Sequence, residues 1–271
     1  MTAPSPRFGR TPRAVYLIAG LLGTAAVLAT FASVVPWYVD NGTFPIDGGY
    51  LVYSQYFTPG PGGYTHACST YVSAHATVCV SFSYDYSGGS GTVSISTLYY
   101  GLLGTSVATA LLAFAGAMTI SAGLQGRVRA RTTRTLVIAF VAAALCAAAA
   151  SAILLPTSQG PAYAGFSGCP GFNGTASPCD SFVGQVNCLG VSTPCSATNG
   201  SNFSWYPQTG WYLAIASAGV LAAGLVLLHF QPLAAPCPFC GTLNRFPARY
   251  CITCSRPLPA DKLKNSVGYR L

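Results

Sequence analysis

Residues 127–155, RVRARTTRTLVIAFVAAALCAAAASAILL, join the two kinds of sequence that decide this fold. The first eight residues carry four arginines, and the rest contain no charged side chain. A helix needs about 20 apolar residues to cross about 30 Å of hydrocarbon. The stretch therefore predicts a transmembrane helix over residues 136–155, preceded by a short basic link over residues 125–135.

Three further stretches of the chain have the same apolar, uncharged character. They cover residues 14–35, 98–124 and 211–230 and are rich in Leu, Val, Ala and Ile. Only 7% of the chain is Asp, Glu, Lys or Arg, against about 25% in an ordinary soluble domain. We therefore expect a bundle of four membrane helices. The first could be a cleaved signal peptide, but its length and the lack of a small-x-small cleavage site favour a retained helix.

All thirteen basic residues lie on one side of the predicted helices. They occupy the N-terminal tail 1–13, the link 125–135 and the segment after the fourth span, which ends in the tail 259–271. The loops 36–97 and 156–210 contain none. By the positive-inside rule, both termini are cytosolic and the two long loops are extracellular. The net charge of +8 thus marks topology in the cell membrane, and we expect no nucleic-acid partner.

The two outer loops have the composition of an exported surface. They contain an even number of cysteines, as a disulfide framework requires. They also contain four N-x-S/T sequons, which predict N-glycosylation where the host has the machinery, although such tripeptides also arise by chance in polar loops. The cysteines are Cys68, Cys79, Cys169, Cys179, Cys188 and Cys195, and the sequon asparagines are Asn41, Asn173, Asn199 and Asn202.

The first outer loop predicts a small antiparallel sheet. Apolar and polar residues alternate over residues 78–86, the pattern of a half-buried strand. Residues 50–57 and 91–96 are further strand candidates, and Gly-Gly pairs supply the turns. We expect three or four strands. A disulfide between Cys68 and Cys79 would join two neighbours and stabilise them by about 2–4 kcal/mol.

The second outer loop is rich in Gly, Pro, Ser and Asn and has almost no periodicity. Its four cysteines allow three pairings, among which the sequence does not choose. Aromatic residues cluster where both loops meet the predicted spans, as in an interfacial aromatic belt. They are Trp37, Tyr38, Tyr99, Tyr100, Trp205, Tyr206, Trp211 and Tyr212.

The predicted spans contain small residues every four positions and no charged side chain. Small residues let helix backbones approach closely, which favours a tight bundle and allows self-association through a free face. They are Ala139, Ala143 and Ala147 in the third span, and Ala214, Ala218 and Ala222 in the fourth.

One specific motif follows the fourth span. Two C-x2-C pairs lie ten residues apart, and such pairs can place four thiolates as a tetrahedron about 2.3 Å from one metal ion. Paired thiols in the cytosol bind metal more often than they form disulfides. The motif predicts one structural Zn²⁺ ion with no open coordination position, and rubredoxin-like iron is the alternative. The ligands are Cys237, Cys240, Cys251 and Cys254.

This motif, CPFCGTLNRFPARYCITC, resembles the short CPxCG-type zinc-ribbon family found at the ends of prokaryotic membrane and regulatory proteins. The resemblance implies that residues 236–258 carry their metal on the four cysteines and serve as a small interaction module for a cytosolic protein partner. Ser255 stands where the family often has a second Gly. We expect this change to loosen the second turn without removing a ligand.

The layout of the whole chain resembles claudin-type four-span membrane proteins. Trp37, Cys68 and Cys79 match the Trp and the cysteine pair that support an extracellular sheet used in cell–cell contact in that family. The Gly-Leu-Trp that precedes the family's first cysteine is absent, and the second outer loop is longer. The resemblance therefore concerns architecture and does not by itself assign a function.

These observations predict an all-α four-helix membrane bundle with a small disulfide-stapled, β-rich extracellular region and a cytosolic zinc ribbon. We expect a non-enzymatic multi-pass membrane protein whose ectodomain makes surface contacts or acts as a scaffold. A small-molecule transporter or channel is an alternative, although the uncharged spans argue against it. A four-helix thiol–disulfide oxidoreductase is another, but both C-x2-C pairs lie on the predicted cytosolic side.

Overall fold

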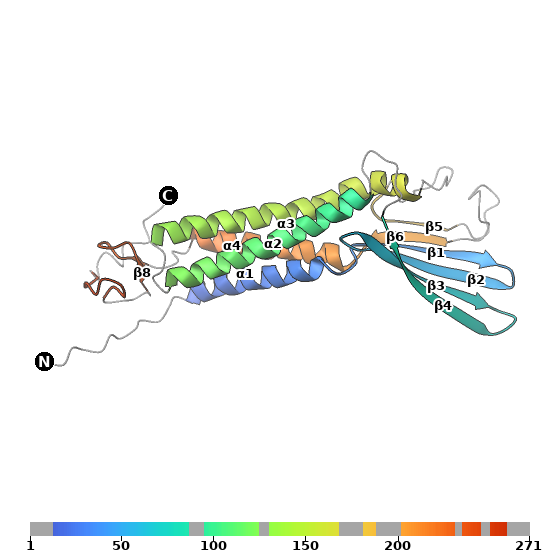
Figure 1. The fold of residues 1–271 in the computed structure, drawn as a ribbon, viewed down its shortest axis with the longest axis horizontal. Coiled ribbons are helices and arrows are strands. Elements are labelled where there is room, and N and C mark those ends of the chain that lie inside the picture. Colours follow the sequence, from blue (N-terminus) through green and yellow to red (C-terminus); the bar gives the residue numbers. More distant parts are fainter. Residues whose placement is uncertain are drawn as a thin grey trace. The chain divides into compact units, whose positions relative to one another are not determined.

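The computed structural model describes residues 13–86, 95–124, 130–167, 181–187, 202–230, 235–244 and 250–258. They form four helices, a six-stranded sheet and a two-stranded sheet (Figure 1). The chain divides into two compact units, and every helix contributes to both. The bundle unit comprises Met1–Val27, Ala108–Cys146 and Ala216–Leu271, and the sheet unit comprises Leu28–Val107 and Ala147–Ile215.

Each of the four helices corresponds to one of the predicted apolar spans, but α1 ends at Ala32, three residues before the expected end at residue 35. Each is long and apolar enough to cross a membrane, with a mean hydropathy between 1.7 and 2.5 over the apolar stretch. The third continues past the expected end at residue 155 and passes through Pro156 and Pro161. The helices are α1 (Arg13–Ala32), α2 (Ile95–Leu124), α3 (Ala130–Ser167) and α4 (Thr209–Phe230).

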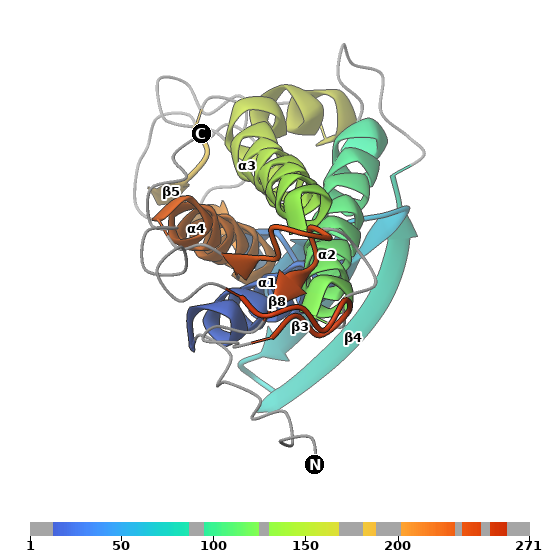
Figure 2. The same ribbon diagram turned by 90° about the vertical axis from the view of Figure 1, so that its left-hand side faces the viewer.

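Small residues bring the helices together in the bundle unit, which Figure 2 shows from its end. A Cβ atom added to Gly116 of α2 would lie 3.2 Å from Leu22 Cδ1 of α1 and 3.7 Å from Phe140 Cβ of α3. Ser217 of α4 donates a hydrogen bond to the carbonyl of Ala25 in α1, at 3.2 Å. This interhelical bond gives a buried polar side chain a partner inside the bundle.

The sheet unit contains six antiparallel strands in the order β4-β3-β2-β1-β6-β5 (Figure 1). Four strands come from the first predicted outer loop and two from the second. They are β1 (Tyr38–Ile46), β2 (Gly49–Phe57), β3 (Gly62–Tyr71), β4 (Ala76–Asp85), β5 (Gly184–Asn187) and β6 (Asn202–Pro207).

The structure confirms two of the three strand candidates in the first outer loop and corrects the third. The candidates at 50–57 and 78–86 correspond to β2 and β4. The candidate at 91–96 is wrong where it can be compared, because Ile95 and Ser96 begin α2, while residues 91–94 lie outside the described residues. The second loop also contributes β5 and β6, although its sequence lacks strand periodicity.

The apolar alternation of β4 does not lead to uniform burial. Tyr86, just past the strand, is 1% exposed in the core of the sheet unit. Val78, Val80 and Phe82 on the same face are 58%, 55% and 54% exposed. The strand prediction was right, but the apolar side of β4 is covered only near the helix ends within the part of the chain that the structure describes.

The core of the sheet unit is aromatic and lies where the strands meet the helix ends. Phe57 of β2 stacks on Tyr99 of α2 with ring centroids 5.7 Å apart, and Tyr86 stacks on Tyr99 at 5.1 Å. Trp37 and Trp205 are fully buried in the same core. Trp37, Tyr99 and Trp205 were expected to belong to an interfacial belt, and that interpretation is wrong for them because they are buried within the protein. Tyr100 and Tyr212 remain exposed.

All three tryptophans donate their indole N–H groups to backbone carbonyls in the sheet unit, and two of these carbonyls belong to helices. Trp37 Nε1 donates to the carbonyl of Ala32 at the end of α1, at 2.5 Å. Trp211 Nε1 donates to the carbonyl of Ala152 in α3, at 2.9 Å. That carbonyl would normally accept from the amide four residues later, but Pro156 has no N–H. Trp211 therefore supplies the donor that α3 lacks at its proline.

Short hydrogen-bonded links attach the sheet to α1 and α4. The Trp37 amide donates to the Phe57 carbonyl at 2.9 Å, and the Gln208 amide donates to the Trp37 carbonyl at 2.8 Å. The Gly210 amide donates to the Pro36 carbonyl at 2.9 Å. A Cβ on Gly210 would lie 2.2 Å from Trp37 Cδ1, so this approach requires glycine.

Candidate metal centre

The four cysteines of the C-terminal motif converge in the bundle unit. Their Sγ atoms all lie within 4.8 Å of one another. Cys237 Sγ is 3.6 Å from Cys254 Sγ, and Cys240 Sγ is 3.4 Å from Cys251 Sγ. Ligands about 2.3 Å from a tetrahedral metal ion are about 3.8 Å apart. The cluster therefore has nearly the dimensions of a four-thiolate metal site.

The first cysteine pair lies on a tight turn held by a short ladder. The ladder consists of β7 (Ala235–Pro236) and β8 (Leu243–Asn244). Between them, the Cys237 amide donates to the Thr242 carbonyl at 2.9 Å, and the Gly241 amide donates to the Cys237 carbonyl at 2.8 Å. Gly241 has a φ of +71°, a left-handed conformation that suits glycine.

The second cysteine pair repeats this turn. The Cys251 amide donates to the Arg256 carbonyl at 2.9 Å, and the Ser255 amide donates to the Cys251 carbonyl at 3.0 Å. Ser255 occupies the position equivalent to Gly241 and has a φ of +54°. The expected loosening is therefore not seen in the hydrogen bonds. Serine instead takes the left-handed conformation, which costs a residue with a Cβ about 1–2 kcal/mol.

Asn244 connects the two turns. Its Nδ2 donates to the Thr242 carbonyl at 2.9 Å, and its Oδ1 accepts from the Ile252 amide at 2.9 Å. The side chain is 1% exposed. One buried amide thus fixes the position of one cysteine turn relative to the other. No spacing rule pointed to Asn244, because a lone Asn eight residues before Ile252 has no distinctive sequence signal.

The pKa values of two cysteine thiols are shifted in opposite directions, that of Cys240 downward and that of Cys254 upward. The hydroxyl of Thr242, 3.4 Å from Cys240 Sγ, and then its backbone amide lower the pKa of the Cys240 thiol to about 6. A backbone hydrogen bond from Arg256 favours the Cys254 thiolate, but desolvation and the other three sulfurs raise the pKa of Cys254 to about 12. Neighbouring thiolates repel one another, so a bound cation would favour the fully ionised set.

The surroundings of the cluster are compact for so short a segment. Cys237 and Cys251 are each 2% exposed and pack with Leu258, which is also buried. The Thr253 amide points at Cys251 Sγ from 3.4 Å, an N–H···S contact of the kind that stabilises a thiolate. The four sulfurs can fill a tetrahedral coordination sphere, which describes a structural site better than a catalytic one.

Among the outer cysteines, the expected pair Cys68 and Cys79 forms a disulfide between β3 and β4. The two residues are direct partners in the register. The other predicted disulfide cysteines lie outside the described residues, so their pairing stays a prediction. They are Cys169, Cys179, Cys188 and Cys195.

Two of the four sequon asparagines lie in the sheet. Asn41 is in β1 between two strands, and its Nδ2 donates to Tyr206 Oη at 3.2 Å. Asn202 begins β6, and its Oδ1 is buried with no hydrogen-bond partner in the described part of the chain. Asn173 and Asn199 lie outside the described residues. Glycosylation therefore stays a prediction at all four positions.

Comparisons with known proteins assign no family to this chain. No protein-family model matches the sequence, and no curated protein matches it. A functional interpretation therefore rests on the residues and geometry described above.

Proposed function

We propose that this chain is a multi-pass membrane protein whose four helices span the bilayer. The observation that carries the proposal is the apolar outer surface of the helices. Only 28–33% of each apolar stretch is buried within the protein. Large apolar side chains such as Leu17, Phe114, Ile153 and Val226 are exposed instead. Apolar surface left in water costs about 25 cal/mol per Å², so a lipid environment accounts for this arrangement.

The proposed orientation follows from the basic residues. All of them lie in the N-terminal tail, in the predicted link 125–135 and in the segment after the fourth span. The positive-inside rule therefore supports cytosolic termini and an extracellular sheet. The disulfide between Cys68 and Cys79 supports the same orientation, because disulfides persist in oxidising compartments.

We propose that the four-cysteine cluster holds one structural Zn²⁺ ion. Its four sulfurs, their tetrahedral spacing and the buried first cysteine of each turn support this assignment. Iron bound to four thiolates has similar geometry, so elemental analysis is needed to identify the metal. The segment is too short to bury a sizeable core, and its folding should be coupled to metal binding.

The ribbon and the sheet are proposed to act as interaction surfaces rather than as an enzyme. On the ribbon, Phe239 and Tyr250 are exposed, and the Arg256 guanidinium lies 4.9 Å from the centroid of the Phe239 ring. Exposed aromatics beside an arginine are typical of protein interfaces and support a cytosolic protein partner. The resemblance to claudin-type proteins supports a contact role for the extracellular sheet.

Self-association through the third helix is a further part of the proposal. Ala139 and Ala143 are exposed on α3, one helical turn apart. Ala214 of α4 is buried in the core of the sheet unit. The small residues of α3 therefore offer the freer of the two faces for close helix packing.

Metal analysis of the purified full-length protein tests the ribbon. We expect one zinc per chain, and we expect the double variant Cys237→Ser and Cys240→Ser to lose it while still inserting into membranes. Cys146→Ser is the matched control, because Cys146 is a free cysteine on α3 outside the cluster. A protein without zinc, or a double variant that fails to insert, would contradict the separation of bundle and ribbon.

Labelling of intact cells with a membrane-impermeant thiol reagent tests the orientation. A single cysteine introduced at Ser73, in the turn between β3 and β4, should react from outside. A cysteine introduced at Thr253, in the ribbon, should react only after lysis. The opposite pattern would reverse the topology and, with it, the proposed roles of the two surfaces.

A further inference from the structure

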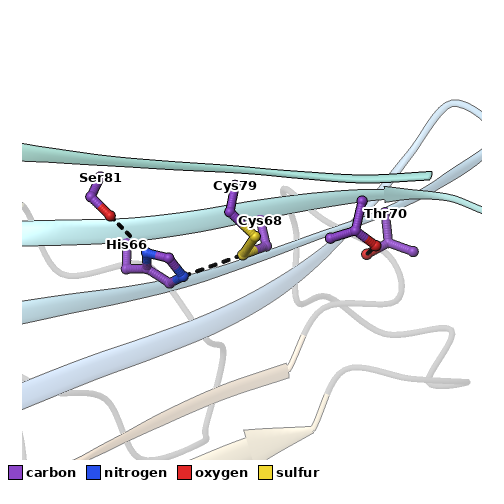
Figure 3. The surroundings of a disulfide bond; sticks show 6 residues. His66, Cys68, Thr70, Cys79 and Ser81 are labelled. Atoms are coloured by element: carbon purple, nitrogen blue, oxygen red, sulfur yellow. Dashed lines mark hydrogen bonds between the residues drawn. A yellow bond between two sulfur atoms is a disulfide. The ribbon is translucent and has the colours of Figure 1, made fainter.

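The disulfide between β3 and β4 has a histidine and a serine arranged beside it. His66 and Ser81 are direct partners in the register, one same-face step from the Cys68–Cys79 pair. His66 Nδ1 lies 2.8 Å from Ser81 Oγ, and His66 Nε2 lies 3.4 Å from Cys68 Sγ. Figure 3 shows the imidazole between the hydroxyl and the sulfur.

The two sulfurs of this disulfide differ in their surroundings. Cys79 is exposed and Cys68 is half-buried, and the imidazole contacts Cys68. His66 is exposed as well. A dissolved thiol can therefore approach the Cys79 side of the bond, while Cys68 lies beside a group that can donate a proton. This difference favours attack on Cys79 Sγ with Cys68 Sγ as the leaving sulfur.

We propose that Cys68–Cys79 is a thiol–disulfide exchange site whose substrate is a small or peptide thiol. The substrate thiolate attacks Cys79 Sγ, forming a mixed disulfide as the Cys68–Cys79 bond breaks. The bonding electron pair moves to Cys68 Sγ, and protonated His66 donates its Nε2 proton to that sulfur. A second substrate thiolate then attacks the substrate sulfur of the mixed disulfide, the bond from that sulfur to Cys79 Sγ breaks, and the Cys79 thiolate takes a proton from water. The protein pair is reduced to two thiols, and two substrate thiols are oxidised to one disulfide.

Ser81 orients the imidazole for this step. When its Oγ accepts a hydrogen bond from Nδ1–H, the other ring nitrogen points at Cys68 Sγ. Exchange is faster when the leaving sulfur is stabilised as it departs. A neighbouring imidazolium provides this stabilisation for a leaving thiolate. The proposal goes beyond the contact function proposed above and does not depend on it.

Within the described strands, the groups that face His66 are neutral hydroxyl and phenol side chains beside the disulfide. On the same face, β2 places Ser54 opposite His66. The next titratable groups are Tyr56 and Tyr64, which stack on each other with centroids 4.6 Å apart. Asp85 is the acidic residue of β4 and lies four residues beyond Ser81. Within the described parts of β2, β3 and β4, no carboxylate lies beside His66.

Sequence spacing concealed this site. Cys68 and Cys79 are separated by eleven positions in the chain, whereas the reactive pairs of disulfide-forming enzymes are usually C-x2-C. The β3–β4 register removes this separation and also brings His66 opposite Ser81. The period-two pattern H-A-C was the available signal, because it places His66 and Cys68 on one face of a strand.

The test measures exchange on the full-length protein in detergent. The probe is an electron-poor aromatic thiol that stays ionised from about pH 5.5 to about pH 8, the range in which imidazoles gain and lose a proton. Iodoacetamide traps the released cysteine, and peptide mass spectrometry identifies which sulfur carries the probe. We expect the aromatic adduct on Cys79 and the alkyl group on Cys68, with a rate that rises as the pH falls.

The variants separate the chemical role of His66 from a structural one. His66→Gln should slow exchange at the acidic end by about tenfold or more and flatten the pH profile. Ser81→Ala should give a smaller loss with the profile retained. His75→Asn is the control, because His75 lies in the β3–β4 turn at a φ of +49° that Asn tolerates. Equal rates for His66→Gln and His75→Asn, or an adduct mainly on Cys68, would overturn the proposal.

Discussion

The indole N–H of Trp211 should stabilise the protein only because α3 contains Pro156. Its indole N–H pairs the Ala152 carbonyl, which Pro156 cannot pair. Trp211→Phe keeps an aromatic ring against Phe182, whose centroid is 5.3 Å from that of Trp211, but removes the donor. Leaving a buried acceptor unpaired costs about 1–3 kcal/mol. We expect a loss near the middle of that range, because the bond is only partly buried.

A double-mutant cycle isolates this effect. Pro156→Ala restores an amide N–H that can donate to Ala152, so Trp211→Phe should cost little in the Pro156→Ala background. The coupling energy should therefore be about 1–2 kcal/mol, and the intrinsic effect of removing proline cancels in the cycle. The measurement is unfolding in detergent micelles titrated with SDS and followed by far-UV circular dichroism.

Trp205 provides the matched control for this cycle. Its Nε1 donates to the Ser181 carbonyl at 3.0 Å, and no proline created the need for that donor. Trp205→Phe should cost the same free energy in both backgrounds. If Trp211→Phe is also equally destabilising with and without Pro156, then Trp211 contributes packing alone and the explanation for the intact helix is wrong.

Three further predictions concern the turns and links. Ser255→Gly should relieve the left-handed strain at φ +54°. The variant should therefore bind its metal more tightly by about 1 kcal/mol, or about fivefold, in chelator competition. Weaker metal binding would contradict this prediction. Asn244→Ala should lower the chelator concentration that strips the ribbon, since two hydrogen bonds worth about 1 kcal/mol each are lost, while loading stays at one metal per chain. Gly210→Ala should destabilise the protein by about 1–3 kcal/mol in SDS titration because its Cβ would collide with Trp37, whereas Gly219→Ala in the same helix meets nothing within 4 Å and should be neutral.

The helices and the cysteine cluster were predictable because their signals are local. Twenty uncharged apolar residues in a row require no tertiary information, and two C-x2-C pairs state the ligand set directly. Ser255 shows where such local prediction fails, because a serine in place of the usual glycine suggested a looser second cysteine turn. The backbone keeps the same hydrogen bonds there and places serine in a conformation usually left to glycine.

The sheet was only partly predictable because its pairing is non-local. β1 has the sequence YVDNGTFPI. It contains Asp, Asn, Gly and Pro, residue types that are rare in strands and common in turns. It is nevertheless an interior strand, paired with β2 and β6. Pro45 is tolerated because pairing with β6 stops at Thr43. The apolar side of β4 and the His66–Ser81 pair likewise depend on register, which strand periodicity does not specify.

Because the links between the sheet and the helix ends are short, each hairpin should move together with the helix ends. Three backbone hydrogen bonds connect the ends of the strands to the segments beside α1 and α4. They join Trp37 to Phe57, Gln208 to Trp37 and Gly210 to Pro36. A rotation of these helix ends would therefore swing the β3–β4 turn, a full strand length away, through a larger arc. A fluorophore on Ser73 would convert small helix tilts into displacements large enough for single-molecule energy transfer. A longer linker inserted at Gln208 would loosen the connection to α4 and leave the Trp37–Phe57 link next to α1 in place.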